Sequence, residues 1–152
     1  MDPAPPAAPV APRGFTLLEL AVVLTLLTIL VGLGTPLWRG SVDQWAVRSV
    51  RDRTLAALHR TRLEARTRGG ARLEVEGPTG RVTVWAADSL LWEDASAAEH
   101  RVTVALPGGG PVAPLAFDAL GLGVVTSRTL VFRRGDAEAR LVVSARGRGT
   151  RR

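Results

Sequence analysis

The stretch from Phe15 to Trp38 constrains this chain most, because Glu19 is its one charged side chain. About 20 consecutive apolar residues are enough for a helix to cross the hydrocarbon core of a membrane. A carboxylate inside such a run is costly to remove from water and normally has a specific partner or task. The run therefore predicts a helix that lipid or other subunits bury, with Glu19 as the first candidate functional residue.

The helical pattern continues past this run to Arg68. Gly32, Gly34 and Pro36 weaken the backbone ladder, so we expect a kink or a locally melted turn there. Residues 39–69 form an amphipathic half, which Gly69-Gly70 should end. Such a helix is roughly 80 Å long, and no domain of this size buries that length. Its apolar positions recur at helical spacing: Trp38, Val42, Trp45, Val47, Val50 and Leu58.

After Gly70 the apolar residues alternate with polar ones, as they do in β-strands. Two such runs, 73–75 and 82–84, flank the turn Gly77-Pro78-Thr79-Gly80 and predict a hairpin. Further strand candidates are 90–92, 101–106, 115–118, 129–133 and 139–144. The expected fold class is α+β: a long N-terminal α-helix, membrane-spanning in its first half, packed on an antiparallel β-sheet head of residues 70–152.

Composition excludes several kinds of chemistry. The chain has no cysteine, so disulfides, thiolate metal sites and cysteine nucleophiles are ruled out. The net charge of +6 is uneven: residues 37–68 carry eight arginines against three acids, residues 69–138 six against nine, and residues 139–152 five against none. A mildly acidic head thus lies between two basic zones, and only the basic zones invite anionic partners.

Catalytic residues are scarce. His59 lies between basic residues on the predicted helix and His100 follows Glu99 in a loop, with nothing at metal-ligand spacing beside either. No serine has a nucleophile-elbow pattern around it. We therefore predict no enzyme activity, no metal and no cofactor. A membrane-anchored hydrolase is the rival here, and it would require His59 or His100. The tryptophans at 38, 45, 85 and 92 are interpreted as core and interface residues, Trp38 at the membrane boundary.

The residues Arg13-Gly14-Phe15-Thr16-Leu17-Leu18-Glu19-Leu20 open the apolar run. This pattern resembles the processing site of type IV prepilins and pseudopilins. The resemblance implies that a membrane peptidase removes residues 1–14 as a leader, cutting between Gly14 and Phe15, and that Phe15 is then N-methylated. It also implies that Glu19, the fifth mature residue, pairs with the amino terminus of a neighbouring subunit during assembly. A lone carboxylate near the bilayer edge is the plainer interpretation of Glu19.

The C-terminal third carries a second resemblance. Phe117-x-x-x-Gly121, the strands near 130–132 and 139–143, and the pair Gly147-Arg148 resemble the closing block of the pseudopilin H/FimT group. The basic tail has two interpretations, a solvated terminus or a phosphate-binding strip that captures DNA, as in some FimT-like minor pilins. Its spacing matches that motif only in part. The candidate phosphate ligands are Arg146, Arg148, Arg151 and Arg152.

Together these observations predict a minor pilin or pseudopilin. Its expected partners are the prepilin peptidase/methyltransferase, other pilins or pseudopilins, inner-membrane lipid and, through the tail, DNA. The expected localisation is the inner membrane, with a single span (residues 15–38) and the head in the periplasm, before assembly into a filament. Type II secretion, a type IV pilus and DNA uptake remain open, as does a single-span protein with a periplasmic β domain that never polymerises.

Overall fold

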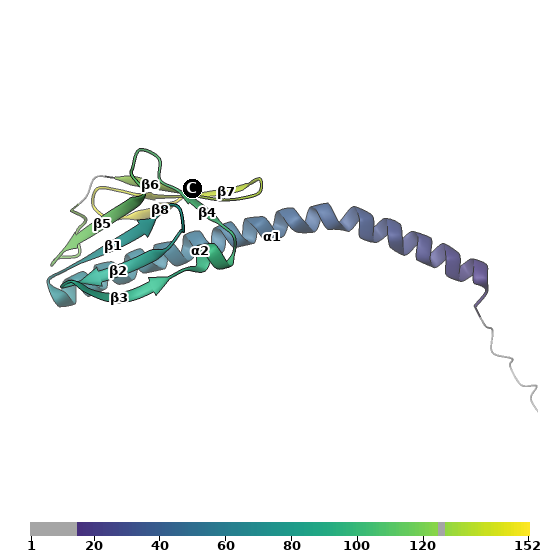
Figure 1. The fold of residues 1–152 in the computed structure, drawn as a ribbon, viewed down its shortest axis with the longest axis horizontal. Helices are drawn as coiled ribbons and strands as arrows, with labels where there is room; N and C mark the ends of the chain where they lie inside the picture. The colour runs from purple at the N-terminus through teal and green to yellow at the C-terminus, as the bar shows by residue number, and fades with distance from the viewer. Residues whose placement is uncertain (1–14, 125–126) are drawn as a thin grey trace, which may run out of the picture. The chain divides into compact units, whose positions relative to one another are not determined.

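The computed structural model describes residues 15–124 and 127–152, and within the long helix it describes no side chains for residues 33–39. The chain divides into two compact units, Met1–Leu37 and Trp38–Arg152. Figure 1 shows the long helix α1 (Leu17–Arg68), whose C-terminal half belongs to the second unit together with all the strands.

The start and the end of α1 follow from local chemistry. Thr16 precedes the helix, and its carbonyl accepts the N–H of Leu20 at 3.1 Å. Gly69 follows the helix with φ +78, the left-handed conformation that commonly ends helices and that glycine adopts without strain. The helical assignment continues through Gly32, Gly34 and Pro36. The locally melted turn is therefore wrong, while the alternative of a kink there stays a prediction, and the predicted stop at Gly69-Gly70 is confirmed.

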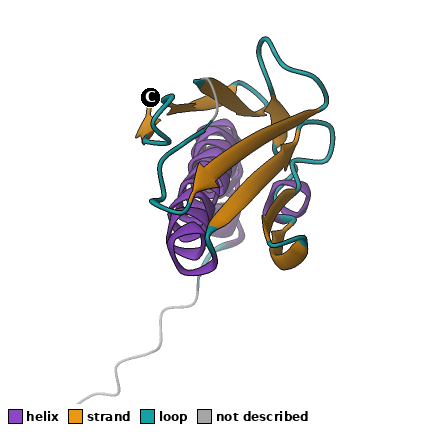
Figure 2. Ribbon diagram, turned by 90° about the vertical axis from the view of Figure 1, so that its left-hand side faces the viewer, coloured by secondary structure: helices purple, strands orange, loops and turns teal. Residues whose placement is uncertain are grey.

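The head contains two antiparallel sheets. One has the order β3-β2-β1-β5 and the other the order β4-β6-β7-β8. A short helix, α2 (Ser96–Glu99), links them. Figure 2 shows the second unit nearly end-on, with the strands beside the helix. The strands are β1 (Gly70–Glu76), β2 (Val82–Ala86), β3 (Ser89–Asp94), β4 (Thr103–Ala105), β5 (Val112–Asp118), β6 (Arg128–Arg134), β7 (Ala137–Val143) and β8 (Gly149–Arg151).

The predicted hairpin is confirmed as β1 paired with β2, with Leu73 opposite Val84 and Val75 opposite Val82. Gly80 N–H donates to the Glu76 carbonyl at 2.8 Å and closes the turn. β1 pairs on its other edge with β5, so that residues 70–76 lie opposite 112–118. β3 to β7 overlap the strand candidates read from the sequence, whereas α2 and β8 were not predicted.

One core unites the C-terminal half of α1 with both sheets. From the helix, Val47, Val50 and Leu58 are buried as expected. Val42 and Trp45 share the helical spacing but are 38% and 61% exposed, so Trp45 is not a core residue, and its interpretation as an interface residue stays a prediction. The largest fully buried side chains are Phe132, Leu58, Leu73, Leu130 and Leu141. The predicted α+β class, a long helix on an antiparallel β head, is confirmed.

Within the described residues, no helix combines the length and the hydropathy that crossing a membrane requires. The membrane crossing expected of residues 15–38 stays a prediction.

Candidate functional site

The first turn of α1 holds the residues of the expected processing and assembly site. Thr16 Oγ1 accepts the backbone N–H of Glu19 at 3.1 Å, an N-cap that satisfies one of the free donors at the helix start. Thr16 and Glu19 have the three-residue spacing of a capping box. The Glu19 carboxylate is exposed and has no partner among the described residues. It is therefore available to a charged group from outside the chain.

The two residues of the expected scissile bond lie just before this cap. Gly14 lies outside the described residues. Phe15 comes two residues before the helix begins and is 82% exposed. A bond between Gly14 and Phe15 would leave Phe15 one residue before the capping Thr16, so cleavage there would remove none of the helix.

Apart from Glu19, the N-terminal part of α1 exposes large apolar side chains on all sides. Two threonines interrupt it, and each donates its hydroxyl to its own helix at 2.8 Å, Thr25 to the Ala21 carbonyl and Thr28 to the Leu24 carbonyl. Large exposed apolar surfaces mark sites of protein or membrane contact. The exposed large side chains here are Phe15, Leu17, Leu18, Leu20, Val22, Val23, Leu24, Leu26, Leu27, Ile29, Leu30 and Val31.

The arginine-rich tail forms an edge strand. β8 pairs with β7, with Arg151 opposite Leu141, and Arg140 and Arg152 exchange two backbone hydrogen bonds of 2.9 and 3.0 Å. Arg151 Nε also lies 3.2 Å from Asp52 Oδ1 on α1. Residues 149–151 thus form a paired edge strand in which Thr150 and Arg151 stay exposed, and both interpretations of the tail remain predictions. The other three tail arginines of the predicted site, Arg146, Arg148 and Arg152, are exposed.

The glycines of the tail serve packing and turn geometry. Gly147 has φ +76, and its N–H donates to the Ser144 carbonyl at 2.8 Å in the turn after β7. A Cβ atom on Gly149 would lie 2.5 Å from Leu55 Cδ1 on α1. These contacts give the glycines a structural reason that needs no phosphate. One sign of this packing role was present in the sequence, namely the resemblance to a closing block in which a phenylalanine precedes a glycine–arginine pair.

Two arginines of α1, Arg62 and Arg66, hold the loop that follows β5. Arg62 Nε donates to the Gly121 carbonyl at 3.0 Å and Arg66 Nε to the Leu120 carbonyl at 3.1 Å. From the other side, Asp118 Oδ1 accepts the N–H groups of Leu120 and Leu122 at 2.9 and 2.8 Å. The loop is thereby fixed while Leu120 is 70% exposed.

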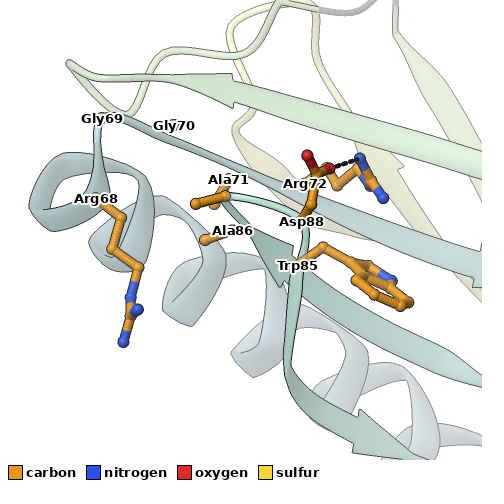
Figure 3. Close-up of a pocket in the computed structure, with 9 residues that line it drawn as sticks. Arg68, Gly69, Gly70, Ala71, Arg72, Trp85, Ala86 and Asp88 are labelled. Carbon is orange, nitrogen blue, oxygen red and sulfur yellow. Dashed lines mark ion pairs between the residues drawn. The ribbon is translucent and has the colours of Figure 1, made fainter.

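A cavity of about 300 Å³ lies where α1 ends and β1 begins (Figure 3). Arg72 pairs with Asp88 at 3.5 Å and with Glu74 at 3.1 Å, and its guanidinium lies 5.3 Å from the centre of the Trp85 ring. Arg68, also on the wall, pairs with Glu64 at 2.9 Å. Since both arginines of this cavity have acidic partners within the chain, the cavity lacks a free charge for a ligand.

The histidines do not form a catalytic arrangement. His59 is exposed on α1. The His100 ring lies edge-on to Trp45, with centroids 5.5 Å apart, and its carbonyl accepts a hydrogen bond from Arg134 at 2.7 Å. Residues 15–124 and 127–152 contain no group of His, Cys, Asp and Glu side chains that would hold a metal ion.

Comparison with known proteins adds to this geometry. Residues 11–35 match the family model of the prokaryotic N-terminal methylation motif. The comparison with curated proteins gave no match. Two crystal forms of the type IV minor pilin FimU from Pseudomonas aeruginosa strain PAO1 resemble the structure. One has a TM-score of 0.55 at 20% identity, covering 70% of this chain and 87% of FimU. The other has a TM-score of 0.54 at 20% identity, covering 69% and 91%.

At this level of identity the likeness to FimU shows the fold, while the motif match concerns the N-terminal segment. The chain therefore resembles type IV pilins both in its N-terminal motif and in its fold, as its sequence predicted. The motif spans Gly14, Phe15 and Glu19.

Proposed function

We propose that this chain is the precursor of a minor pilin or pseudopilin, a structural subunit of a type IV pilus or of a type II secretion pseudopilus. The observation that carries the proposal is the pairing of an N-terminal methylation motif at residues 11–35 with the fold of a minor pilin. The role is mechanical, and no catalytic group is assigned to it. Other pilins or pseudopilins are its partners in the filament.

In this proposal a prepilin peptidase cuts between Gly14 and Phe15, and Phe15 is methylated at its new amino terminus. Residues 15–38 anchor the chain in the inner membrane before assembly, with the head in the periplasm. The exposed apolar side chains between Phe15 and Val31 support this placement. When the chain enters the filament, neighbouring subunits replace lipid around the same apolar surface. Because both environments are apolar, one segment suits both.

Glu19 sets the position of one subunit against the next. The methylated amine of a neighbouring Phe15 keeps its positive charge and would face the Glu19 carboxylate, which has no partner among the described residues. Two opposite charges that leave water together are far less costly than either charge alone. Registers that leave the carboxylate unpaired are therefore disfavoured.

The test is the mass of the N-terminal tryptic peptide from cells with and without the prepilin peptidase. Trypsin cuts after Arg13 and Arg39, so an unprocessed chain gives the peptide 14–39. A processed chain gives the peptide 15–39, lighter by one glycine and heavier by one methyl group. Peptide 15–39 with its methyl group, found only when the peptidase is present, is the expected result.

A peptide that begins at Gly14 in both strains would contradict the proposal. It would favour a single-span membrane protein with a periplasmic β domain that never polymerises. A Gly14→Leu variant is the control within the chain, because a large side chain next to the scissile bond should block cleavage and leave the head folded.

DNA capture by the tail is the second candidate function. Arg146, Arg148 and Arg152 are exposed and have no side-chain partner among the described residues, which favours it. The ion pair of Arg151 with Asp52 weighs against it. Duplex DNA should bind in a strongly salt-dependent way if the tail is the site, and an Arg146→Gln, Arg148→Gln variant should reduce the salt slope by about two. Unchanged binding in that variant would exclude the tail.

A further inference from the structure

Two arginines of α1 stand apart from the others. Beyond residue 40, the remaining arginines of the helix each have a partner: Arg48 with Gln44, Arg51 with Asp52, Arg62 and Arg66 with the loop carbonyls, and Arg68 with Glu64. Arg53 and Arg60 are exposed and have no hydrogen bond or ion pair with any described residue. Their charges are therefore not compensated within the described part of the chain.

Both arginines line the same cavity, which has a volume of about 260 Å³. They are seven residues apart, close to two helical turns, so they lie on one face of α1 about 10 Å apart along its axis. Ala56 and Ala57 lie between them in the helix sequence and also line the cavity, as do Trp92 and Asp94 of β3. The lining of the cavity thus combines two arginines, two alanines, one indole and one carboxylate.

The walls of the cavity do not neutralise its cations. Asp94 Oδ1 accepts the N–H of Ser96 at 2.7 Å, and Asp94 forms no ion pair with Arg53 or Arg60 within 4.0 Å. Trp92 is half-buried and packs against the core, so the indole face is held in place by the sheet. The lining carries two positive charges against the one negative charge of Asp94, and the two guanidinium groups have no partner among the described residues.

The charge and the size of the cavity indicate which chemical class of ligand it can bind. A guanidinium engages a carboxylate through paired N–H donors, and the contact strengthens where apolar groups exclude water. A volume of about 260 Å³ suits one side chain and not a polymer. A polyanion would also meet the acidic head, where residues 69–138 carry nine acids against six arginines. A single carboxylate on a protein fits these conditions better than a nucleic acid does.

We propose that the cavity between Arg53, Arg60 and Trp92 binds an aspartate or glutamate side chain of a neighbouring filament subunit. The inference rests on the proposed function, since the filament supplies the neighbour. The carboxylate would lie between the two guanidinium groups, with its methylene stem on Ala56 and the Trp92 ring. The contact would set which subunit lies beside this head, a role separate from that of the apolar helix.

Photocrosslinking of the full chain in cells with its own assembly system tests the proposal. Ala56 is exposed and lines the cavity, so an Ala56→p-benzoylphenylalanine variant places the probe there. The expected product is a crosslink to another pilin-like subunit, mapped by mass spectrometry to a peptide that contains Asp or Glu. Arg53→Gln together with Arg60→Gln should lower the yield by about twofold to fivefold, because an exposed ion pair contributes up to about 1 kcal/mol.

Arg48→Gln is the matched control, because Arg48 lies on the same helix, bonds Gln44 and does not line this cavity. It should leave the yield unchanged. A charge swap is the second control. Arg53→Glu and Arg60→Glu in this chain, combined with an arginine in place of the mapped acid in the neighbouring subunit, should restore the crosslink. Restoration is a readout that a merely structural role of the arginines would not produce.

Three results would overturn the proposal: a crosslink to DNA, a yield that does not depend on Arg53 and Arg60, or no crosslink from chains that are methylated at Phe15 and present in filaments. The mass of the N-terminal peptide is measured in the same samples. If Phe15 is not processed and the chain stays out of filaments, the proposed function is wrong, and this inference, which rests on it, is wrong as well. The two failures are thereby distinguished.

Discussion

A Cβ atom on Gly147 would lie 2.4 Å from Cε1 of Phe117. Phe117 is buried at the end of β5, and Gly147 lies in the turn between β7 and β8. Phe117 also forms an isolated bridge with Gly123, where a Cβ atom would lie 2.6 Å from the Gly147 nitrogen. The phenylalanine and the glycine of the C-terminal block are thus parts of one packed junction. The tail begins from this junction, so the block is explained by packing.

Gly147→Ala should destabilise the head by about 2 to 4 kcal/mol. The left-handed backbone at φ +76 disfavours alanine, and the new methyl group overlaps the Phe117 ring. Gly108→Ala is the matched control, because Gly108 has φ +75 and nothing within 4 Å of its Cβ position. It should cost about 1 kcal/mol, from backbone strain alone. Tryptophan fluorescence during urea unfolding measures both, and equal losses would mean that the Phe117 contact contributes nothing.

Asp43 and Arg134 should couple more strongly than the other ion pairs of the head. Arg134 Nε lies 2.8 Å from Asp43 Oδ1, both side chains are less than a third exposed, and Arg134 also donates to the His100 carbonyl. A double-mutant cycle with Asp43→Asn and Arg134→Gln should give about 1 kcal/mol of coupling in the free energy of unfolding. The more exposed pair of Arg81 and Glu93 at 3.4 Å is the control, with coupling below about 0.5 kcal/mol. Equal couplings would contradict this ranking.

Glu138 should contribute stability that is lost in acid. Hydrogen bonds from Arg133 at 2.8 Å and from Arg140 at 2.7 Å hold the pKa of Glu138 below its ordinary value. A carboxyl whose pKa is lower in the folded state stabilises the fold above its unfolded pKa of about 4.3, and this stability disappears as the pH falls through the folded pKa.

The free energy of unfolding of the wild type should therefore exceed that of Glu138→Gln near pH 6, and the difference should shrink as the pH falls toward about 3. Arg133→Gln should raise the pKa of Glu138, which an NMR titration of its side-chain carboxyl carbon measures directly. A stability difference that stays constant across this pH range would show that the arginines do not favour the charged form.

Sequence periodicity predicted the parts of the fold in which apolar residues mark the buried face. The β1–β2 hairpin alternates cleanly, with Leu73, Val75, Val82 and Val84 all buried. β8 escaped prediction because Gly149-Thr150-Arg151 has no apolar side chain. Its strand conformation comes from pairing with β7, which lies nearby only after folding.

The buried face of α1 was predicted only in part, for a related reason. Small and hydroxyl residues carry much of it, and they give little hydropathy signal. Thr54 and Thr61 are 2% and 0% exposed. Each donates its hydroxyl to the carbonyl four residues earlier, so no hydroxyl is buried without a hydrogen bond. Once Ala46, Ala57 and Ala65 are counted with them, the buried stripe turns away from Trp45 and leaves that indole exposed.

At the candidate site, sequence indicated Glu19 from its position and charge, but it gave no sign of the cavity at Arg53 and Arg60. That cavity depends on Trp92 reaching α1 from β3, a contact between residues far apart in the chain. In a chain whose basic residues are all arginine, two further arginines on a helix have no distinguishing pattern. Their lack of partners becomes visible only when every other arginine of the helix beyond residue 40 is found to have one.

Glu19→Gln should impair assembly and leave the head intact. The substitution removes the charge at nearly constant volume and keeps a residue type suited to the third position of a capped helix. If the carboxylate pairs with the amine of a neighbouring Phe15, that amine would be left buried without a partner. Breaking one side of a buried pair costs about 3 to 5 kcal/mol, so incorporation into filaments should fall at least about tenfold. Cleavage and methylation at Phe15 should persist.

Sheared filaments and membrane fractions, compared by immunoblot, measure this partition, and the N-terminal peptide mass reports processing in the same cells. Thr16→Ala is the control, because it removes the hydroxyl that accepts the Glu19 N–H at 3.1 Å and leaves the charge. The lost cap weakens the helix start by about 1 kcal/mol and should reduce incorporation much less than Glu19→Gln does. If Glu19→Gln chains enter filaments at the wild-type level while Phe15 is methylated, the carboxylate has no pairing role. In that case the apolar surface between Phe15 and Val31 would have to set the register without it.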